Sequence, residues 1–163
     1  MRMVNAVGVA ALLAAGALAL PVRAQEVFDA CEVFTQPDAE KALGTTAAPE
    51  AVNPKLAKAK RPKVVTTCTY EGFRDGKPVA ATVQFRFGRT DAEAQQSFDE
   101  ARLQFQTKPL LISGSDAFWS GKTGQMNLRK GRTWVTLSVG PDKVSERDID
   151  AAKKLAEILV QKL

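Results

Sequence analysis

Two kinds of apolar spacing divide the chain into predicted strands and predicted helices. Apolar side chains alternate with polar ones in two successive segments and again near the C-terminus, which is typical of half-buried strands. The predicted strands are 64–71, 79–87 and the two arms of a hairpin that turns at Lys130-Gly131. Other segments repeat apolar residues at helical spacing. The predicted helices are 36–43, 91–106 and a C-terminal helix that starts with a capping box at Ser145.

Turn and capping residues support these limits. Thr35 and Gly44 suit the N-cap and the C-terminal stop of the first helix. Thr90 opens a capping box before the second helix, and Pro109 ends it. Asp75-Gly76 provides the positive φ angles that a tight turn between the first two strands requires. Each predicted element therefore has a local reason to begin and end where its apolar pattern does.

Two segments carry no such pattern. Residues 45–63 contain three prolines and predict a long exposed loop, and residues 110–116 predict a connection. Leu110, Leu111 and Ile112 in that connection are expected to be buried under the sheet. The resulting order, α-β-β-α-β-β-α, predicts an α+β fold with a four-stranded antiparallel sheet and helices packed on one face.

The alternation in the last hairpin separates a core face from a solvated face. The predicted core residues are Met126, Leu128, Val135, Leu137 and Val139. The other face receives Gln125, Asn127, Trp134, Thr136 and Ser138.

Residues 1–24 have the pattern of an export signal. Arg2 precedes an apolar run from Ala6 to Leu20, and Val22-Arg23-Ala24 fits the small-x-small rule for cleavage before Gln25. The run is too short for a reliable membrane span. We therefore expect residues 25–163 to form one α+β domain, in the periplasm or outside the cell, with no transmembrane segment.

Export gives a structural meaning to the two cysteines, Cys31 and Cys68. In an oxidising compartment, two thiols in a small domain most simply form a disulfide. The alternatives are a reactive thiol and a metal site. A thiolate nucleophile normally needs a neighbouring base, and two cysteines without histidine are too few for structural zinc. We expect a Cys31–Cys68 disulfide, no metal and no cofactor.

The composition removes several classes of catalysis. The 163 residues include no histidine, which excludes histidine-dependent triads and imidazole zinc sites. Ser120-Gly121-Lys122-Thr123 resembles the end of a phosphate-binding loop, but that loop needs a glycine where Asp116 stands. The enzymatic alternative is a hydrolase or transferase with a carboxylate site or a Ser–Lys dyad. The dyad would pair Ser113, Ser115 or Ser120 with Lys122.

A cluster of basic residues is the main electrostatic feature of a chain with a net charge of +5. The cluster lies in the predicted loop 45–63 and consists of Lys55, Lys58, Lys60, Arg61 and Lys63. It predicts contact with an anionic surface component or an acidic envelope protein. Nucleic acid is not expected, because the loop has no aromatic residues on which bases could stack. The alternative is a solvated loop without a partner.

The tryptophans mark a second candidate contact surface. An aromatic ring in polar surroundings is typical of a ligand contact. In the alternative interpretation, Trp119 covers the edge of the core and Trp134 packs on the stem of a neighbouring arginine, Arg86, Arg129 or Arg132. The candidate ligand-binding residues are Trp134, Asn127, Trp119 and Asp116.

Several short motifs resemble those of small secreted bacterial domains of unknown function. They are Cys31 ahead of the Thr35–Gly44 helix, Cys68-Thr-Tyr70, Gly114-Ser-Asp116-Ala-Phe-Trp119 and the Lys130-Gly131 hairpin. The resemblance spans 31–163 and includes actinobacterial cell-envelope lipoproteins and extracellular kinase-sensor-like domains. It implies a ligand-sensing or envelope-accessory module without known catalysis, although this chain lacks the lipobox of the lipoproteins. The sequence thus predicts an exported, non-catalytic monomer that binds an unidentified ligand or envelope partner.

Overall fold

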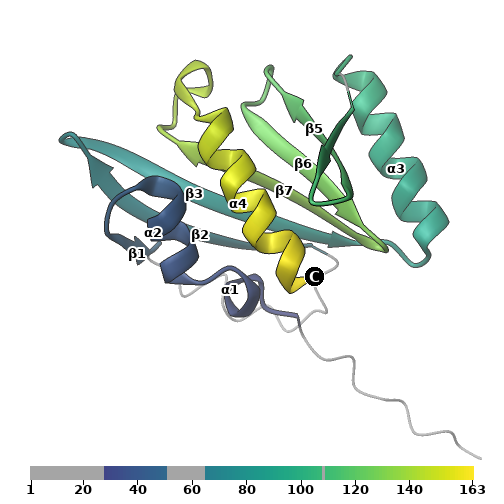
Figure 1. Cartoon of the computed structure of the whole chain (residues 1–163), viewed down its shortest axis with the longest axis horizontal. Coiled ribbons are helices and arrows are strands. Elements are labelled where there is room, and N and C mark those ends of the chain that lie inside the picture. Colours follow the sequence, from purple (N-terminus) through teal and green to yellow (C-terminus); the bar gives the residue numbers. More distant parts are fainter. Residues whose placement is uncertain (1–27, 51–64, 108) are drawn as a thin grey trace, which may run out of the picture.

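The computed structural model describes residues 28–50, 65–107 and 109–163 (Figure 1). Its centre is an antiparallel sheet with the strand order β1-β2-β3-β7-β6-β5-β4. The strands are β1 (Ala47–Pro49), β2 (Val65–Arg74), β3 (Lys77–Phe87), β4 (Leu110–Ile112), β5 (Ser115–Ser120), β6 (Gln125–Lys130) and β7 (Thr133–Gly140). The helices are α1 (Ala30–Val33), α2 (Gln36–Leu43), α3 (Asp91–Gln104), α4 (Ile149–Lys162) and the 3-10 helix η1 (Val144–Glu146). The predicted signal peptide and the basic residues of the predicted loop, Lys55 to Lys63, lie outside the described residues.

The fold is α+β, but the prediction of a four-stranded sheet is wrong, because the described part of the chain already contributes seven strands to the sheet. The four predicted strands are present as β2, β3, β6 and β7. The strands that the sequence did not predict are β1, β4 and β5. β1 lies inside the predicted loop, and the β4–β5 hairpin includes the predicted connection. Three-residue strands such as β1 and β4 are too short to show alternation. In β5, buried residues occur on both faces of the sheet, so the sequence does not alternate there either.

Helices cover both faces of the sheet, which corrects the prediction that they pack on one face. In Figure 1, α4 crosses one face of the sheet with α1 and α2 beside it. The strand register places Phe118 and Trp134 on the opposite face from Leu128 and Val135. Phe98 of α3 packs against both of these back-face aromatic rings, at centroid distances of 5.0 and 5.8 Å. The pattern of α3 shows which side of the helix is apolar but not which face of the sheet receives it.

The β6–β7 hairpin turns one residue later than predicted. Its turn residues are Gly131-Arg132, since Lys130 pairs with Thr133 and Arg129 with Trp134. The change shifts each cross-strand pair by two residues, so every side chain keeps its predicted face. The five predicted core residues of this hairpin, Met126, Leu128, Val135, Leu137 and Val139, are all buried in the main core under α4.

The start of α4 also differs from the prediction. Ser145 belongs to η1, and the N-cap of α4 is Asp148. The Asp148 carboxylate accepts hydrogen bonds from the backbone N–H groups of Asp150 and Ala151, at 3.1 and 2.9 Å. These bonds satisfy donors that have no partner inside the helix.

The position of this cap can be tested by two substitutions. Asp148→Ala should lower the free energy of unfolding by about 1 kcal/mol, because it removes an N-cap acceptor. Ser145→Ala should change the free energy of unfolding by less than about 0.5 kcal/mol, as is usual for an exposed position. Urea denaturation of the two variants measures both effects. Equal losses would contradict the assignment of Asp148 as the cap.

An ion pair joins the C-terminal end of α4 to α2. The Lys162 ammonium group donates to the carboxylate of Asp38 and to the backbone carbonyl of Val33, the latter at 3.0 Å. Asp38 is also bound by the backbone N–H of Thr35 at 2.9 Å and by its hydroxyl at 2.6 Å. Burial raises the pKa of Asp38, but the hydrogen bonds from Lys162 and Thr35 outweigh it, so the pKa lies below its ordinary value.

The lowered pKa predicts how stability changes with pH. A carboxylate whose pKa is lower in the folded state stabilises the protein fully above its unfolded pKa, about 3.9, and loses this effect as the pH falls through the folded pKa. The stability difference between the wild type and Asp38→Asn should be constant near neutral pH and shrink below about pH 4. Denaturation midpoints measured across this range test it, with the exposed Asp142→Asn as control. A difference that persists at the acidic end would contradict the role of Asp38.

Candidate functional site

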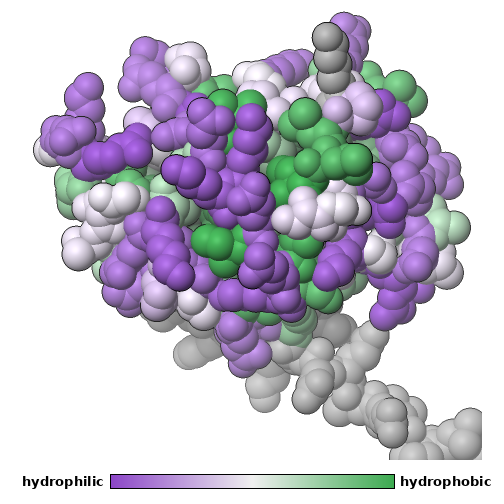
Figure 2. Space-filling model, viewed as in Figure 1, coloured by the Kyte–Doolittle hydropathy of each residue, from purple (hydrophilic) through white to green (hydrophobic). Residues whose placement is uncertain are grey.

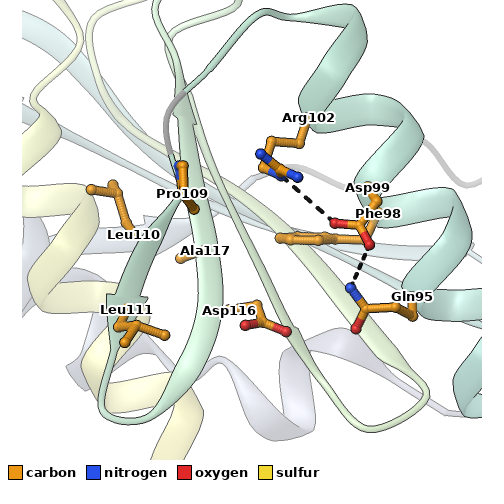
Figure 3. A pocket seen from close by; sticks show the side chains of 9 residues that line it. All are labelled: Gln95, Phe98, Asp99, Arg102, Pro109, Leu110, Leu111, Asp116 and Ala117. Carbon is orange, nitrogen blue, oxygen red and sulfur yellow. Dashed lines mark hydrogen bonds and ion pairs between the residues drawn. The ribbon is translucent and has the colours of Figure 1, made fainter.

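A groove of about 690 Å³ lies between α3 and the β4–β5 hairpin (Figure 3). Its α3 wall is formed by Gln95, Phe98, Asp99 and Arg102. Its opposite wall is formed by Pro109, Leu110, Leu111, Asp116 and Ala117. We call this hollow the α3 groove.

A second cluster of buried side chains holds α3 on the back of the sheet and so sets the width of the groove. Phe98 and Phe118 are both buried, and the ring of Phe105 lies 6.3 Å from that of Phe118. This cluster lies on the other side of the sheet from the main core, which α4 covers. The helix contacts β6 and β7, and the groove lies between it and the β4–β5 hairpin.

Charged groups lie on both walls of the α3 groove. Asp99 accepts a hydrogen bond from Gln95 at 2.7 Å and lies 3.6 Å from the guanidinium of Arg102. Across the groove, one oxygen of Asp116 accepts a hydrogen bond from Arg129 at 2.7 Å. The side chains of Asp99 and Asp116 are 42% and 48% exposed. Two partly exposed carboxylates line the groove, and each lies beside a guanidinium: Asp99 beside that of Arg102 and Asp116 beside that of Arg129.

Apolar surface lies beside these charges. Leu111 is 77% exposed, contrary to the expectation that it is buried, whereas Ile112 is buried and Leu110 packs partly on the core. Figure 2 shows apolar side chains gathered over β4, with hydrophilic side chains around them. A single exposed leucine is common on protein surfaces, but this one borders a groove that charged side chains also line. The exposed leucine makes this wall the most distinctive apolar feature of the groove.

The structure does not bring the four candidate ligand-binding residues together. Asp116 alone lines the α3 groove. Trp119 packs beside the main core, on the other face of the sheet from Asp116. Asn127 is buried and accepts hydrogen bonds from the indole of Trp134 at 3.1 Å and the hydroxyl of Thr136 at 2.9 Å.

The surroundings of Trp134 are those of a structural residue. The guanidinium of Arg86 lies over its ring, 5.1 Å from the centroid, and Phe98 packs against its edge. Arg86 is one of the three arginines named in the alternative interpretation, but it is its guanidinium, rather than its aliphatic stem, that lies over the ring. What remains exposed of Trp134 lines a smaller hollow of about 240 Å³ on the β3 side of α3.

The serines of the enzymatic alternative differ in their place in the sheet, since Ser115 and Ser120 lie on opposite faces of β5. Ser115 and Ser120 are buried, and Lys122 is exposed. None of these three residues lines the α3 groove, and Ser120 accepts a hydrogen bond from the backbone N–H of Thr123. Within 28–50, 65–107 and 109–163, no group of three or more metal-ligating side chains comes together. The geometry therefore offers no particular support for the Ser–Lys dyad.

The disulfide and the helices bear on the expected exported protein. Cys31 and Cys68 form a disulfide, as predicted, with Cα atoms 5.2 Å apart. In the part of the chain that the structure describes, no helix has the length and apolar character needed to cross a membrane.

Sequence reasoning missed most of the α3 groove. Gln95, Asp99 and Arg102 follow one another at helical spacing and interact with each other on one side of α3. That spacing was the available signal, but it is equally typical of a solvated helix face. Only the position of α3 relative to β4 distinguishes a groove wall from a solvated helix face. Comparison of the chain with protein-family models, curated proteins and solved structures found no match.

Proposed function

We propose that this chain is an exported, non-catalytic binding module of the cell envelope, and that the α3 groove is its contact surface. The exposure of Leu111 on the wall of an open groove carries the proposal, because this leucine and the carboxylate of Asp116 together offer apolar and polar contacts to one ligand. The resemblance to small secreted bacterial domains supports the same class of function.

Export is supported by two features of different kinds. The N-terminal 24 residues have the composition of a cleavable leader. The disulfide between Cys31 and Cys68 is typical of proteins that fold in an oxidising compartment.

Fractionation of cells that produce the full chain tests export. We expect the protein outside the cytoplasm with Gln25 as its first residue, and with thiols that react with maleimide only after reduction. A full-length, reduced chain in the cytoplasm would overturn this part of the proposal.

A thermal-shift screen of the purified protein against glycans, metabolites and peptides tests the binding surface. A ligand that uses the groove should raise the melting temperature of the wild type and of Phe73→Ser, but not that of Leu111→Ser. Phe73 is the matched control, since it is 70% exposed and lies near the β2–β3 turn. A ligand that stabilises all three proteins equally would place the binding surface elsewhere.

A further inference from the structure

We infer that the ligand of the α3 groove is an extended polypeptide segment with alternating apolar and basic side chains, which pairs with the free edge of β4. This inference rests on the proposed function and names the class of partner. It is carried by three features that meet at one place: an open strand edge, an exposed leucine and accessible carboxylates.

The backbone of β4 has one edge that no described strand pairs with. Among residues 28–50, 65–107 and 109–163, β4 is the last strand of the sheet and pairs only with β5. A two-residue turn, Ser113-Gly114, joins the two strands, so Ile112 and Ser115 form the hydrogen-bonded pair next to the turn. Hydrogen-bonding direction alternates along a strand, and the N–H and C=O groups of Leu111 therefore point away from β5. An incoming strand can bond to both groups.

The side chains beside this edge favour an apolar residue in the partner. The Leu111 side chain lies on the same face of the sheet as Asp116, because the two residues are directly paired. This is also the face that carries α3. A strand added outside β4 would place every second side chain on that face, beside Leu111 and at the mouth of the groove. Apolar side chains there would cover the exposed leucine.

The charges of the groove favour a basic residue in the partner. Asp116 uses one carboxylate oxygen to bind Arg129, and its side chain remains about half exposed. The added strand would lie about 9–10 Å from β5, which is two strand spacings. A lysine or arginine side chain that extends across β4 can approach Asp116 over that distance. The partly exposed carboxylate of Asp116 could accept a charge-assisted hydrogen bond from that cation.

The same charge argument disfavours a second copy of this chain as the occupant. Pairing of two β4 strands would bring Leu110, Leu111 and Ile112 of each copy together. None of these residues is basic, so the carboxylates of the groove would gain no partner from β4. If the protein forms a dimer without peptide, this result opposes the inference.

Selection of a phage library of random decapeptides on the immobilised protein tests the inference. We expect enrichment of sequences in which apolar and basic residues alternate. An enriched peptide, synthesised and labelled, is then measured by fluorescence anisotropy. Leu111→Pro removes the outward N–H and should raise Kd about tenfold, whereas Leu111→Val keeps this group and should bind like the wild type. Proline is tolerated at an edge position whose N–H faces solvent.

Two further measurements make the result independent of how well Leu111→Pro folds. N-methylation of the one peptide amide that donates to the carbonyl of Leu111 should abolish binding, whereas N-methylation of either neighbouring amide should not. Asp116→Asn should weaken the basic peptide but not a variant whose basic residue is replaced by glutamine. The inference fails if acidic peptides are enriched or if the peptide still binds whichever of its amides carries the N-methyl group. It also fails if Asp116→Asn weakens both peptides equally, or if the protein forms a dimer without peptide. If no peptide is enriched but a non-peptide ligand depends on Leu111, the proposed function stands and this inference fails.

Discussion

Phe98→Ala is expected to lower the free energy of unfolding by about 3–5 kcal/mol, as is typical for truncation of a buried phenylalanine. Phe98 is the large buried side chain through which α3 packs on the sheet, where it contacts Phe118 and Trp134. Its removal leaves a cavity between α3 and the sheet. Chemical denaturation measures the loss, and hydrogen exchange should show that amides of α3 exchange faster than those of α4 in the variant.

Leu103→Ala is the matched control for this prediction. Leu103 lies on the same helix but is 67% exposed. Its truncation should change the free energy of unfolding by less than about 0.5 kcal/mol. Similar losses in the two variants would mean that Phe98 does not hold α3 on the back of the sheet.

Removal of the disulfide has the second large expected effect. The Cys31–Cys68 bond ties the N-terminal α1 to β2 and closes a loop with a sequence separation of 37. A cross-link of this length stabilises a protein by about 4 kcal/mol in the chain-entropy description. The double variant Cys31→Ala, Cys68→Ala should therefore have a much lower denaturation midpoint than the wild type.

Reduction of the wild type provides an independent control for the double variant. A reducing agent should lower the wild-type midpoint toward that of the double variant and leave the variant itself unchanged. If the wild type keeps its denaturation midpoint while both thiols become titratable, the disulfide does not stabilise the folded protein.

Much of the central fold follows from local patterns in the sequence. The helix limits of α2 coincide with the prediction because Thr35 and Gly44 cap it through local interactions. The Asp75-Gly76 turn has both positive φ angles that its sequence predicts. Strands β2 and β3 are long enough for their alternation to be distinct. Features of this kind depend on neighbouring residues alone.

The remaining features depend on contacts between distant segments. β4 has only three residues and becomes a strand through its pairing with β5. The choice of sheet face for α3 depends on Phe118 and Trp134, which are distant from Phe98 in the sequence. Trp134 was a reasonable candidate from its polar neighbours, but the structure covers its ring with Phe98 and Arg86. The α3 groove arises from both of these long-range placements, so the sequence pattern did not reveal it.

Site-specific photo-cross-linking in producing cells tests most directly whether the α3 groove is a binding surface. The photoreactive residue p-benzoylphenylalanine would replace Leu111 in one variant and Phe73 in another, since both side chains are largely exposed. Binding at the groove predicts a discrete, light-dependent adduct from the Leu111 position and none of the same mass from the Phe73 position. Identical adducts from both positions, or no adduct from the Leu111 position, would contradict it.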